Sequence, residues 1–383
     1  MIVISIFLAM VLVFLLMGLV YRRSGLDKLT VKVSFSATRA TEGAKLVLTT
    51  VLTNTKWLPM PWVAVKLKVS KFLLFDDMEN AQVTDHFYRN DLYNILMRQR
   101  ITRRLNFVCS KRGYYYIPSV DVTAWDIMMD TKSAAPIKCG ANLTVYPSFL
   151  SAAEVDNLCV QIYGQLRTQS VMHPDPFSFK GIREYSPRDP LKAVNFKASA
   201  KAQELMVNLW EHTNAREVIL LFNLQKHNLW HNEVLDEYAI KLVVSLAERL
   251  LSENIPIRFI SNGICANTSQ DPDLAPNQAI EISNGVGDMQ LERILEAMAH
   301  LDLAQTKVSQ FSKILELTVA QYKTEPEYWL ISTYHGIDLE DAYINLMNQG
   351  ARTVWVLPKS TGIRLADHEI TLSDEIREKV IIL

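Results

Sequence analysis

Residues 1–20 form one apolar stretch without an ionisable side chain, and Arg22 and Arg23 follow it directly. About 20 residues at a helical rise of 1.5 Å cross the hydrocarbon core of a bilayer. Positive charge lies only after the stretch, and neither a basic start nor a small-residue cleavage site marks a secretory signal. The pattern predicts a transmembrane anchor over residues 1–23, with the rest of the chain facing the cytoplasm. The alternative is a buried, fully apolar core helix.

The following residues alternate between apolar and polar positions with a period of two, which is typical of half-buried strands. The clearest predicted strands span 30–37, 45–54, 63–70, 98–109, 113–126 and 141–148. Turn residues such as Glu42-Gly43 and Lys111-Arg112-Gly113 separate them. Several short strands at this spacing predict an antiparallel β-sandwich over residues 24–148.

Beyond Pro147 the pattern changes to continuous apolar runs that alternate with stretches of helical spacing. The apolar runs predict strands at 216–224, 256–262, 327–333, 352–358 and 378–383. Helical spacing predicts helices near 150–166, 234–250, 288–302 and 338–349. Such alternation indicates a parallel, Rossmann-like sheet flanked by helices over residues 149–383. The predicted fold class is therefore an α+β multidomain chain with a transmembrane helix, a β-sandwich and an α/β domain.

The composition of the chain limits the classes of protein to which it could belong. The chain of 383 residues is 49% hydrophobic and 21% charged, with a formal net charge of −1, so it suits packed domains and has no global field that attracts nucleic acid. Its four cysteines show no CxxC pairing, which disfavours a zinc ribbon and favours a reducing compartment. A single bridge from Cys109 to Cys139 is the alternative in an oxidising space.

Catalytic motifs are missing from the sequence. It contains neither the phosphate-binding GxxxxGK[ST] pattern nor a GxSxG nucleophile elbow. His227 and His231 are four residues apart and, with Glu233, offer three ligands of the kind that zinc uses. A solvated helix start is the simpler interpretation, because a fourth ligand is not evident. We expect no catalytic residue, no metal and no cofactor.

The segment 178–211, called the hallmark segment below, mixes basic and acidic residues with apolar anchors. Its charges include Arg183, Glu184, Arg188, Lys192 and Lys201. Two interpretations are open: a surface that docks a partner, or an internal lattice of salt bridges that holds the segment to the sheet. Contact with nucleic acid or anionic lipid is a third, weaker hypothesis, and it predicts binding that weakens steeply with salt.

The hallmark segment resembles the bacterial family called domain of unknown function 58. The match comprises Gly181, Arg183-Glu184-Tyr185, Asp189, Asn195-Phe196-Lys197 and Ala198-Ser199-Ala200-Lys201. Upstream, 54–62, Arg112-Gly113-Tyr114-Tyr115 and Val145-Tyr146-Pro147 resemble the family's sandwich signatures, so the resemblance covers about residues 30–225. Arg188, Pro190, Lys192 and Phe196 depart from the usual residues of the family.

The later part of that family resembles a von Willebrand factor A domain, whose metal site begins with Asp-x-Ser-x-Ser. Asn223, Gln225 and His227 stand at those positions here. Magnesium prefers hard, charged oxygen ligands, so this set predicts a degenerate site without a functional metal.

The resemblance implies a partner of MoxR-type AAA+ ATPases, often beside other membrane proteins. The hypothesis is a non-catalytic, membrane-tethered adaptor that docks a cytoplasmic ATPase and binds no nucleic acid. The expected partner-binding residues are Arg183, Glu184, Tyr185, Arg188, Asp189, Asn195, Lys197 and Lys201. The alternative is a metal-dependent adhesion or binding domain, or an uncharacterised metal-dependent enzyme.

Overall fold

The computed structural model describes most of the chain. The described residues are 6–8, 10, 18, 21, 25–125, 132–170, 179–186, 194–210, 217–226, 233–265, 279–303, 311–322, 326–358 and 380–383. They divide into two compact units, with the boundary between Ser148 and Phe149. Residues 298–300 group with the first unit.

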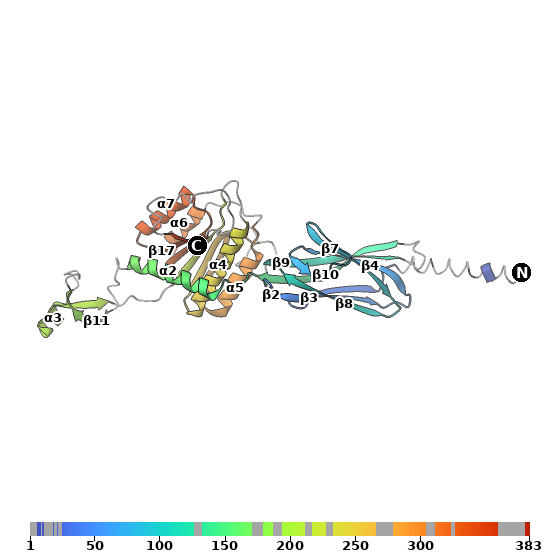
Figure 1. Cartoon of the computed structure of the whole chain (residues 1–383), viewed down its shortest axis with the longest axis horizontal. Helices are drawn as coiled ribbons and strands as arrows, with labels where there is room; N and C mark the ends of the chain where they lie inside the picture. Colours follow the sequence, from blue (N-terminus) through green and yellow to red (C-terminus); the bar gives the residue numbers. More distant parts are fainter. Residues whose placement is uncertain are drawn as a thin grey trace. The chain divides into compact units, whose positions relative to one another are not determined.

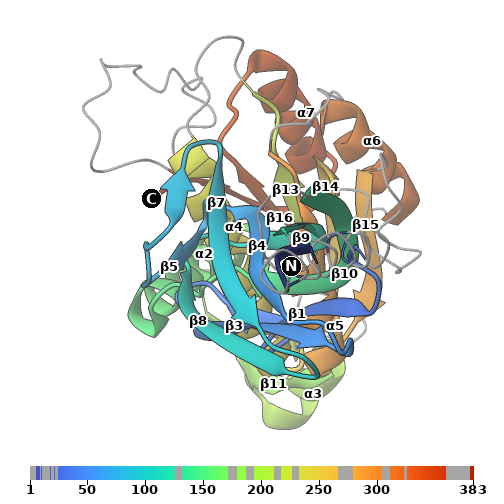
Figure 2. The same ribbon diagram turned by 90° about the vertical axis from the view of Figure 1, so that its right-hand side faces the viewer.

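The described residues of the first unit form ten strands in two sheets that face a common core (Figure 2). Its strands are β1 (Leu29–Phe35), β2 (Arg39–Thr41), β3 (Lys45–Asn54), β4 (Met60–Ser70), β5 (Leu73–Phe75), β6 (Ala81–Val83), β7 (His86–Ile95), β8 (Arg100–Cys109), β9 (Gly113–Trp125) and β10 (Lys132–Tyr146). The sheets have the orders β1-β3-β8-β5 and β2-β10-β9-β4-β7-β6. All pairs are antiparallel except β2 with β10, which is parallel.

Period-two alternation decides which side chains enter this core. In β4, for example, Val65, Leu67 and Val69 are buried, whereas Lys66 and Lys68 between them are exposed. Each inward methyl or methylene group that leaves water contributes about 0.8 kcal/mol. A shift of the strand register by one residue would expose these apolar side chains and bury the lysines. The observed register is therefore strongly favoured.

The described residues of the second unit form one six-stranded sheet, six helices and a small separate sheet (Figure 1). The helices are α2 (Ala152–Ser170), α3 (Phe196–Ala202), α4 (Glu233–Ser252), α5 (Gly287–His300), α6 (Phe311–Tyr322) and α7 (Ile337–Asn348). The strands are β11 (Phe179–Glu184), β12 (Met206–Trp210), β13 (Val218–Asn223), β14 (Ile257–Ile264), β15 (Ala279–Gly285), β16 (Glu327–Ser332), β17 (Arg352–Leu357) and β18 (Val380–Ile382).

The six-stranded sheet has the order β15-β14-β13-β16-β17-β18. Neighbouring strands run parallel from β14 to β18, and β15 runs antiparallel at the edge. Every residue of β13 and β16 is buried, which explains their continuous apolar sequences. The carboxyl ends of β13, β14 and β16 consequently lie next to one another.

The predicted fold class is wrong. Strands make up 46% of the residues that the structure describes, and strand and helix do not simply alternate after residue 149. Between α2 and β13 the chain forms two further strands, β11 and β12, which pair antiparallel, and α3 lies between them in sequence. Strand β15 is also antiparallel to its neighbour. Local periodicity missed these elements because β11 and β12 lie in a mixed polar segment. The chain is mostly β, and a von Willebrand factor A-like, Rossmann-like domain has no support.

The predicted transmembrane helix and the cell-membrane localisation are corrected as well. No helix formed by the residues that the structure describes is both long enough and apolar enough to cross a bilayer. That prediction rested on the apolar residues 1–20 and on the positive charge of Arg22 and Arg23, and most of these residues lie outside the described ones.

The four cysteines are free thiols, so Cys109 and Cys139 form no bridge. Burial raises the pKa of the Cys109 and Cys159 thiols to about 11. Both thiols are therefore held in the protonated, unreactive form.

Candidate functional site

The hallmark segment folds into a strand, a helix and a strand. β11 pairs with β12 in antiparallel register, for example Arg183 with Val207, and α3 packs against β12 (Figure 1). An isolated bridge between Val194 and Val207 continues the small sheet toward α3. Both valines are buried, so the segment has an apolar centre of its own.

Polar side chains fix the ends of α3. Asn195 is the N-cap, and its Oδ1 accepts a hydrogen bond from the backbone N–H of Ala198 at 3.0 Å. Ser199 Oγ donates to the carbonyl of Asn195 at 2.8 Å and accepts from the N–H of Met206 at 2.9 Å, which ties α3 to β12. Gln203 ends the helix in the left-handed conformation, with φ of 61°. Asn195 therefore has a structural role, which differs from the docking role expected for it.

One face of α3 is exposed and combines an aromatic ring with two cations. Phe196 is 77% exposed, and Lys197, Ala200 and Lys201 beside it are exposed too. These four residues have helical spacing along one side of the helix, and they are called the α3 face below. An aromatic side chain that remains so exposed gains no hydrophobic free energy from folding. Burial against a partner surface would supply that gain.

The remaining hallmark residues lie on β11 or outside the described residues. Arg183 and Glu184 are exposed, and Arg183 Nη1 donates to the carbonyl of Glu184 at 3.0 Å. The N–H of Tyr185 donates to the carbonyl of Leu205 at 2.8 Å and extends the pairing with β12. Arg188 and Asp189 lie outside the described residues.

A second polar cluster lies at the carboxyl ends of β13, β14 and β16. Asn223 is fully buried, and its Oδ1 accepts hydrogen bonds from the N–H of Gln225 at 2.8 Å and from Asn262 Nδ2 at 3.0 Å. Its Nδ2 donates to Ser332 Oγ at 3.1 Å. Asn262 Oδ1 in turn accepts from the N–H of Leu224 at 2.8 Å. The amide of Asn223 thus joins three strands, and we call this cluster the strand-end network.

Gln225 extends the strand-end network to α6 and α7. Gln225 Oε1 accepts from the N–H of Phe311 at 3.2 Å, and Gln225 Nε2 donates to Asp338 Oδ2 at 3.4 Å. Tyr334 Oη donates to Asp338 Oδ1 at 2.6 Å. The cluster is close-packed, because a Cβ added to Gly336 would lie 2.0 Å from Tyr334 Oη. These side chains satisfy one another, which suits a structural clamp better than a reactive centre.

The residues expected at the degenerate metal site have different positions. Asn223 and Gln225 lie in the strand-end network, whereas His227 lies outside the described residues. His231, expected with His227 in the zinc alternative, also lies outside them. Among the residues that the structure describes, no three His, Cys, Asp or Glu side chains gather closely enough to hold a metal ion.

Tyr334 gives the strand-end network a measurable dependence on pH. Burial, together with the hydrogen bond to Asp338, raises the pKa of Tyr334 to about 12. Folding therefore favours the protonated phenol. The resulting stabilisation is complete below the ordinary tyrosine pKa of about 10 and is lost as the pH rises toward 12.

We expect Tyr334→Phe to lower the free energy of unfolding at pH 7 by about 1 kcal/mol, because Asp338 loses a part-buried hydrogen-bond donor. Between pH 10 and 12 the stability of the variant should fall less steeply than that of the wild type. Urea unfolding at a series of pH values measures both effects. Parallel pH profiles for the two proteins would contradict the assignment.

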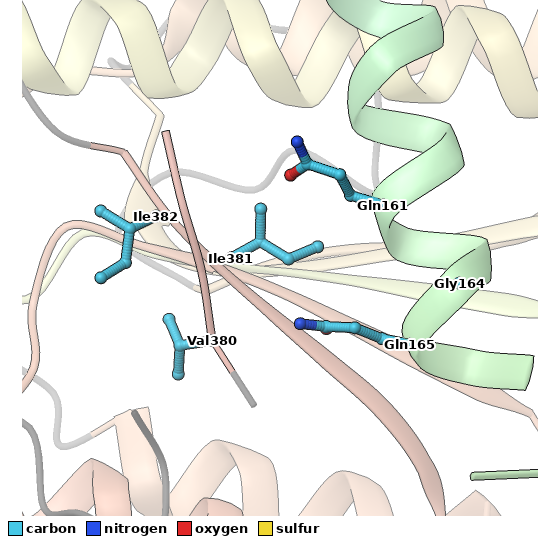
Figure 3. A pocket seen from close by; sticks show the side chains of 6 residues that line it. All are labelled: Gln161, Gly164, Gln165, Val380, Ile381 and Ile382. Atoms are coloured by element: carbon cyan, nitrogen blue, oxygen red, sulfur yellow. The ribbon is translucent and has the colours of Figure 1, made fainter. Parts of the chain in front are cut away.

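A shallow hollow lies between α2 and β18 (Figure 3). It measures about 510 Å³, and its lining comprises Gln161, Gly164, Gln165, Val380, Ile381 and Ile382. Figure 3 shows the two glutamine side chains reaching from α2 toward Ile381. None of the described residues that line this hollow has an ionisable side chain.

Comparisons with known proteins give little guidance. No family model matches the chain, and no curated protein matches it. Among solved structures, the CARDB domain of a Pyrococcus furiosus protein in complex with di-metal ions is 10% identical and covers 31% of this chain and 94% of its own, with a TM-score of 0.20. A non-cellulosomal cohesin from Archaeoglobus fulgidus is 14% identical and covers 34% and 97%, with a TM-score of 0.21.

A cohesin–dockerin complex from Clostridium thermocellum is 13% identical and covers 30% of this chain and 99% of the matched chain, with a TM-score of 0.21. Similarities of this size carry no argument about function. They carry no argument about the fold either. The description of residues 149–383 as a von Willebrand factor A-like, Rossmann-like domain is corrected, because the described part of the chain is mostly β.

The sequence prediction included Lys197 and Lys201 among the docking residues but not Phe196, which it placed in the family match as a departure from the usual residue. A signal for the α3 face was present in the sequence. Asn195 begins a short helical stretch, and positions 196, 197, 200 and 201 then share one side of the helix.

Proposed function

We propose that this chain is a non-catalytic docking protein whose α3 face binds an acidic surface on a protein partner. The exposure of Phe196 beside Lys197 and Lys201 is the observation that carries the proposal. The partner class that we propose is a MoxR-type AAA+ ATPase, which rests on the sequence resemblance of the hallmark segment.

The shape of the α3 face supports this role. None of the residues of helix α3 is buried, so the side chains on its exposed side are accessible to a partner. An aromatic anchor flanked by cations matches an apolar depression rimmed by carboxylates. Two further apolar side chains of the hallmark segment, Leu205 and Ile182, are exposed as well.

The way in which α3 is held also favours docking. The N-cap at Asn195 and the two hydrogen bonds of Ser199 fix the helix before a partner arrives. A surface that is already ordered loses less conformational entropy on binding. The strand-end network favours a supporting role for the large sheet, since its polar groups are used in internal hydrogen bonds.

The test is a binding measurement between the full chain and a purified MoxR-type ATPase from the same organism. Phe196→Ala combined with Lys197→Glu should weaken binding at least about 10-fold, because an anchor and a charge pair are lost together. Biolayer interferometry at two salt concentrations gives the dissociation constants. The wild-type affinity should fall with salt, because the lysines act through exposed charges.

The matched control is Lys313→Glu, which makes the same charge change at an exposed position of α6. We expect its affinity to equal that of the wild type. Equal weakening by both variants would reduce the interaction to non-specific charge attraction. Failure of the wild type to bind the ATPase at micromolar concentration would reject the partner class.

A further inference from the structure

The larger sheet of the first unit has a hollow of about 440 Å³ between β4 and β9, called the β4–β9 hollow below. Residues of these two strands line it, together with His86 of β7. Exposed side chains such as Lys66 and Tyr116 place it on the outer face of the sheet. Its volume lies within the roughly 300–1,000 Å³ that is usual for small-molecule sites.

Two opposite charges stand beside each other at one end of the β4–β9 hollow. Lys66 and Asp121 are direct partners across β4 and β9, and both are exposed and line the hollow. Residues that lie directly opposite each other have Cβ atoms roughly 4.5–5.5 Å apart. In the described part of the chain, neither side chain takes part in an ion pair or a hydrogen bond. The ammonium group and the carboxylate are therefore available to a ligand as a donor and an acceptor.

The pair of Lys66 and Asp121 disfavours a ligand with net charge. An anion placed between the two groups is repelled by the carboxylate, and a cation is repelled by the ammonium group. Two further polar side chains of the lining have neighbours outside it. Lys68 Nζ lies 5.7 Å from the centre of the Tyr88 ring, and His86 Nδ1 lies 3.0 Å from Asp85 Oδ2.

An aromatic wall borders the β4–β9 hollow on the side of β9. Tyr116 is 52% exposed, and the centre of its ring lies 6.3 Å from that of Tyr114, with an angle of 18° between the two planes. Pro118, two residues further along the strand, is exposed on the same side and also lines the hollow. The wall therefore offers a flat apolar surface next to the donor and the acceptor.

We propose that the β4–β9 hollow binds a neutral saccharide. A pyranose ring has an apolar C–H face, which packs on an aromatic ring such as that of Tyr116. Its hydroxyl groups each donate and accept hydrogen bonds, so neighbouring hydroxyls donate to Asp121 and accept from Lys66 at the same time. An apolar planar ligand would remove both groups from water without replacing their hydrogen bonds. The site lies in the first unit and does not depend on the α3 face.

The experiment is saturation-transfer difference NMR with the full chain and the neutral disaccharides maltose, cellobiose and N,N′-diacetylchitobiose. We expect binding at millimolar concentration, weakened at least about 10-fold by Tyr116→Ala, which removes the stacking surface. Tyr116→Phe keeps the ring and should bind within about 3-fold of the wild type. Asp121→Ala should weaken binding at least about 10-fold, because the sugar hydroxyls lose their acceptor. The affinity of the wild type should be the same at low and high salt.

Trp57→Ala is the matched control, because Trp57 is an aromatic residue of the first unit that is 70% exposed and does not line the hollow. This variant should bind like the wild type. Equal weakening by Trp57→Ala and Tyr116→Ala would overturn the proposal by showing non-specific contact between sugars and exposed rings. An affinity that falls with salt, or displacement of the sugar by free serine, would overturn it in favour of a charged or zwitterionic ligand. Absence of a signal from all the disaccharides would overturn it outright.

Discussion

Replacing Arg89 by leucine is expected to lower the free energy of unfolding of the first unit by about 3–5 kcal/mol, the usual cost of breaking a buried ion pair from one side. The Arg89 side chain is 0% exposed, and its Nε lies 2.9 Å from both carboxylate oxygens of Asp91. Its Nη2 lies 2.8 Å from Asp77 Oδ2. Leucine would leave the Asp91 carboxylate, whose side chain is 8% exposed, without its main partner.

Arg103 makes the network of Arg89 partly redundant. Arg103 contacts Asp91 Oδ1 at 3.1 Å and Asp77 Oδ2 at 3.3 Å, and its side chain is 30% exposed. Although burial opposes its charge, the hydrogen bonds to Asp91 and Asp77 raise the pKa of the Arg89 guanidinium. Arg89 therefore stays charged inside the sandwich, where the carboxylates of Asp91 and Asp77 stabilise its charge.

Hydrogen exchange of peptides that span β7 measures the effect of Arg89→Leu in the full chain. Arg104→Leu is the matched control, because Arg104 is an exposed residue of β8 and should change stability by less than about 0.5 kcal/mol. The double variant Arg89→Leu with Asp91→Leu should recover part of the loss, since no buried charge is then left alone. A loss below about 1 kcal/mol for Arg89→Leu would contradict the assigned role.

Asn223→Ala is expected to cost the second unit about 3 kcal/mol. The backbone N–H of Gln225 and the side chain of Asn262 both lose their acceptor at a fully buried position. Each buried donor left without a partner costs roughly 1–3 kcal/mol. Because Asn223 also donates to Ser332, the loss should loosen the join between β13 and β16.

Urea unfolding of the full chain measures the loss of stability. Hydrogen exchange of β13, β14 and β16 measures the loosening between these strands. Asn348→Ala, an exposed change at the end of α7, is the control and should alter stability by less than about 0.5 kcal/mol. A stability equal to that of the wild type would show that water replaces the amide of Asn223. The strand-end network would then not be a clamp.

Several strands follow directly from the sequence, because side chains that alternate between two environments leave a local pattern. The predictions at 45–54 and 63–70 are confirmed by β3 and β4, and that at 216–224 by β13. Long helices with one apolar side are also local features. The predicted stretch 234–250 corresponds to α4. For such elements the period of the hydrophobic positions distinguishes strand from helix without any knowledge of the partner strand.

Strand β7 shows where local pattern fails. Its inward residues are Phe87, Arg89, Asp91, Tyr93 and Ile95, so two charged side chains occupy core positions. A hydrophobic pattern does not recognise that alternation, because the burial of Arg89 depends on Asp77 and Arg103 from other parts of the chain. The spacing of Arg89 and Asp91, two residues apart, was the only local signal.

By itself the sequence determined which segments alternate and which are continuously apolar, because each of these properties depends on neighbours within a few positions. The tertiary structure alone decided the strand-end network, which joins residues more than 100 positions apart such as Asn223 and Ser332. Pairing across such distances depends on loop closure and packing, and neither leaves a periodic trace in the chain.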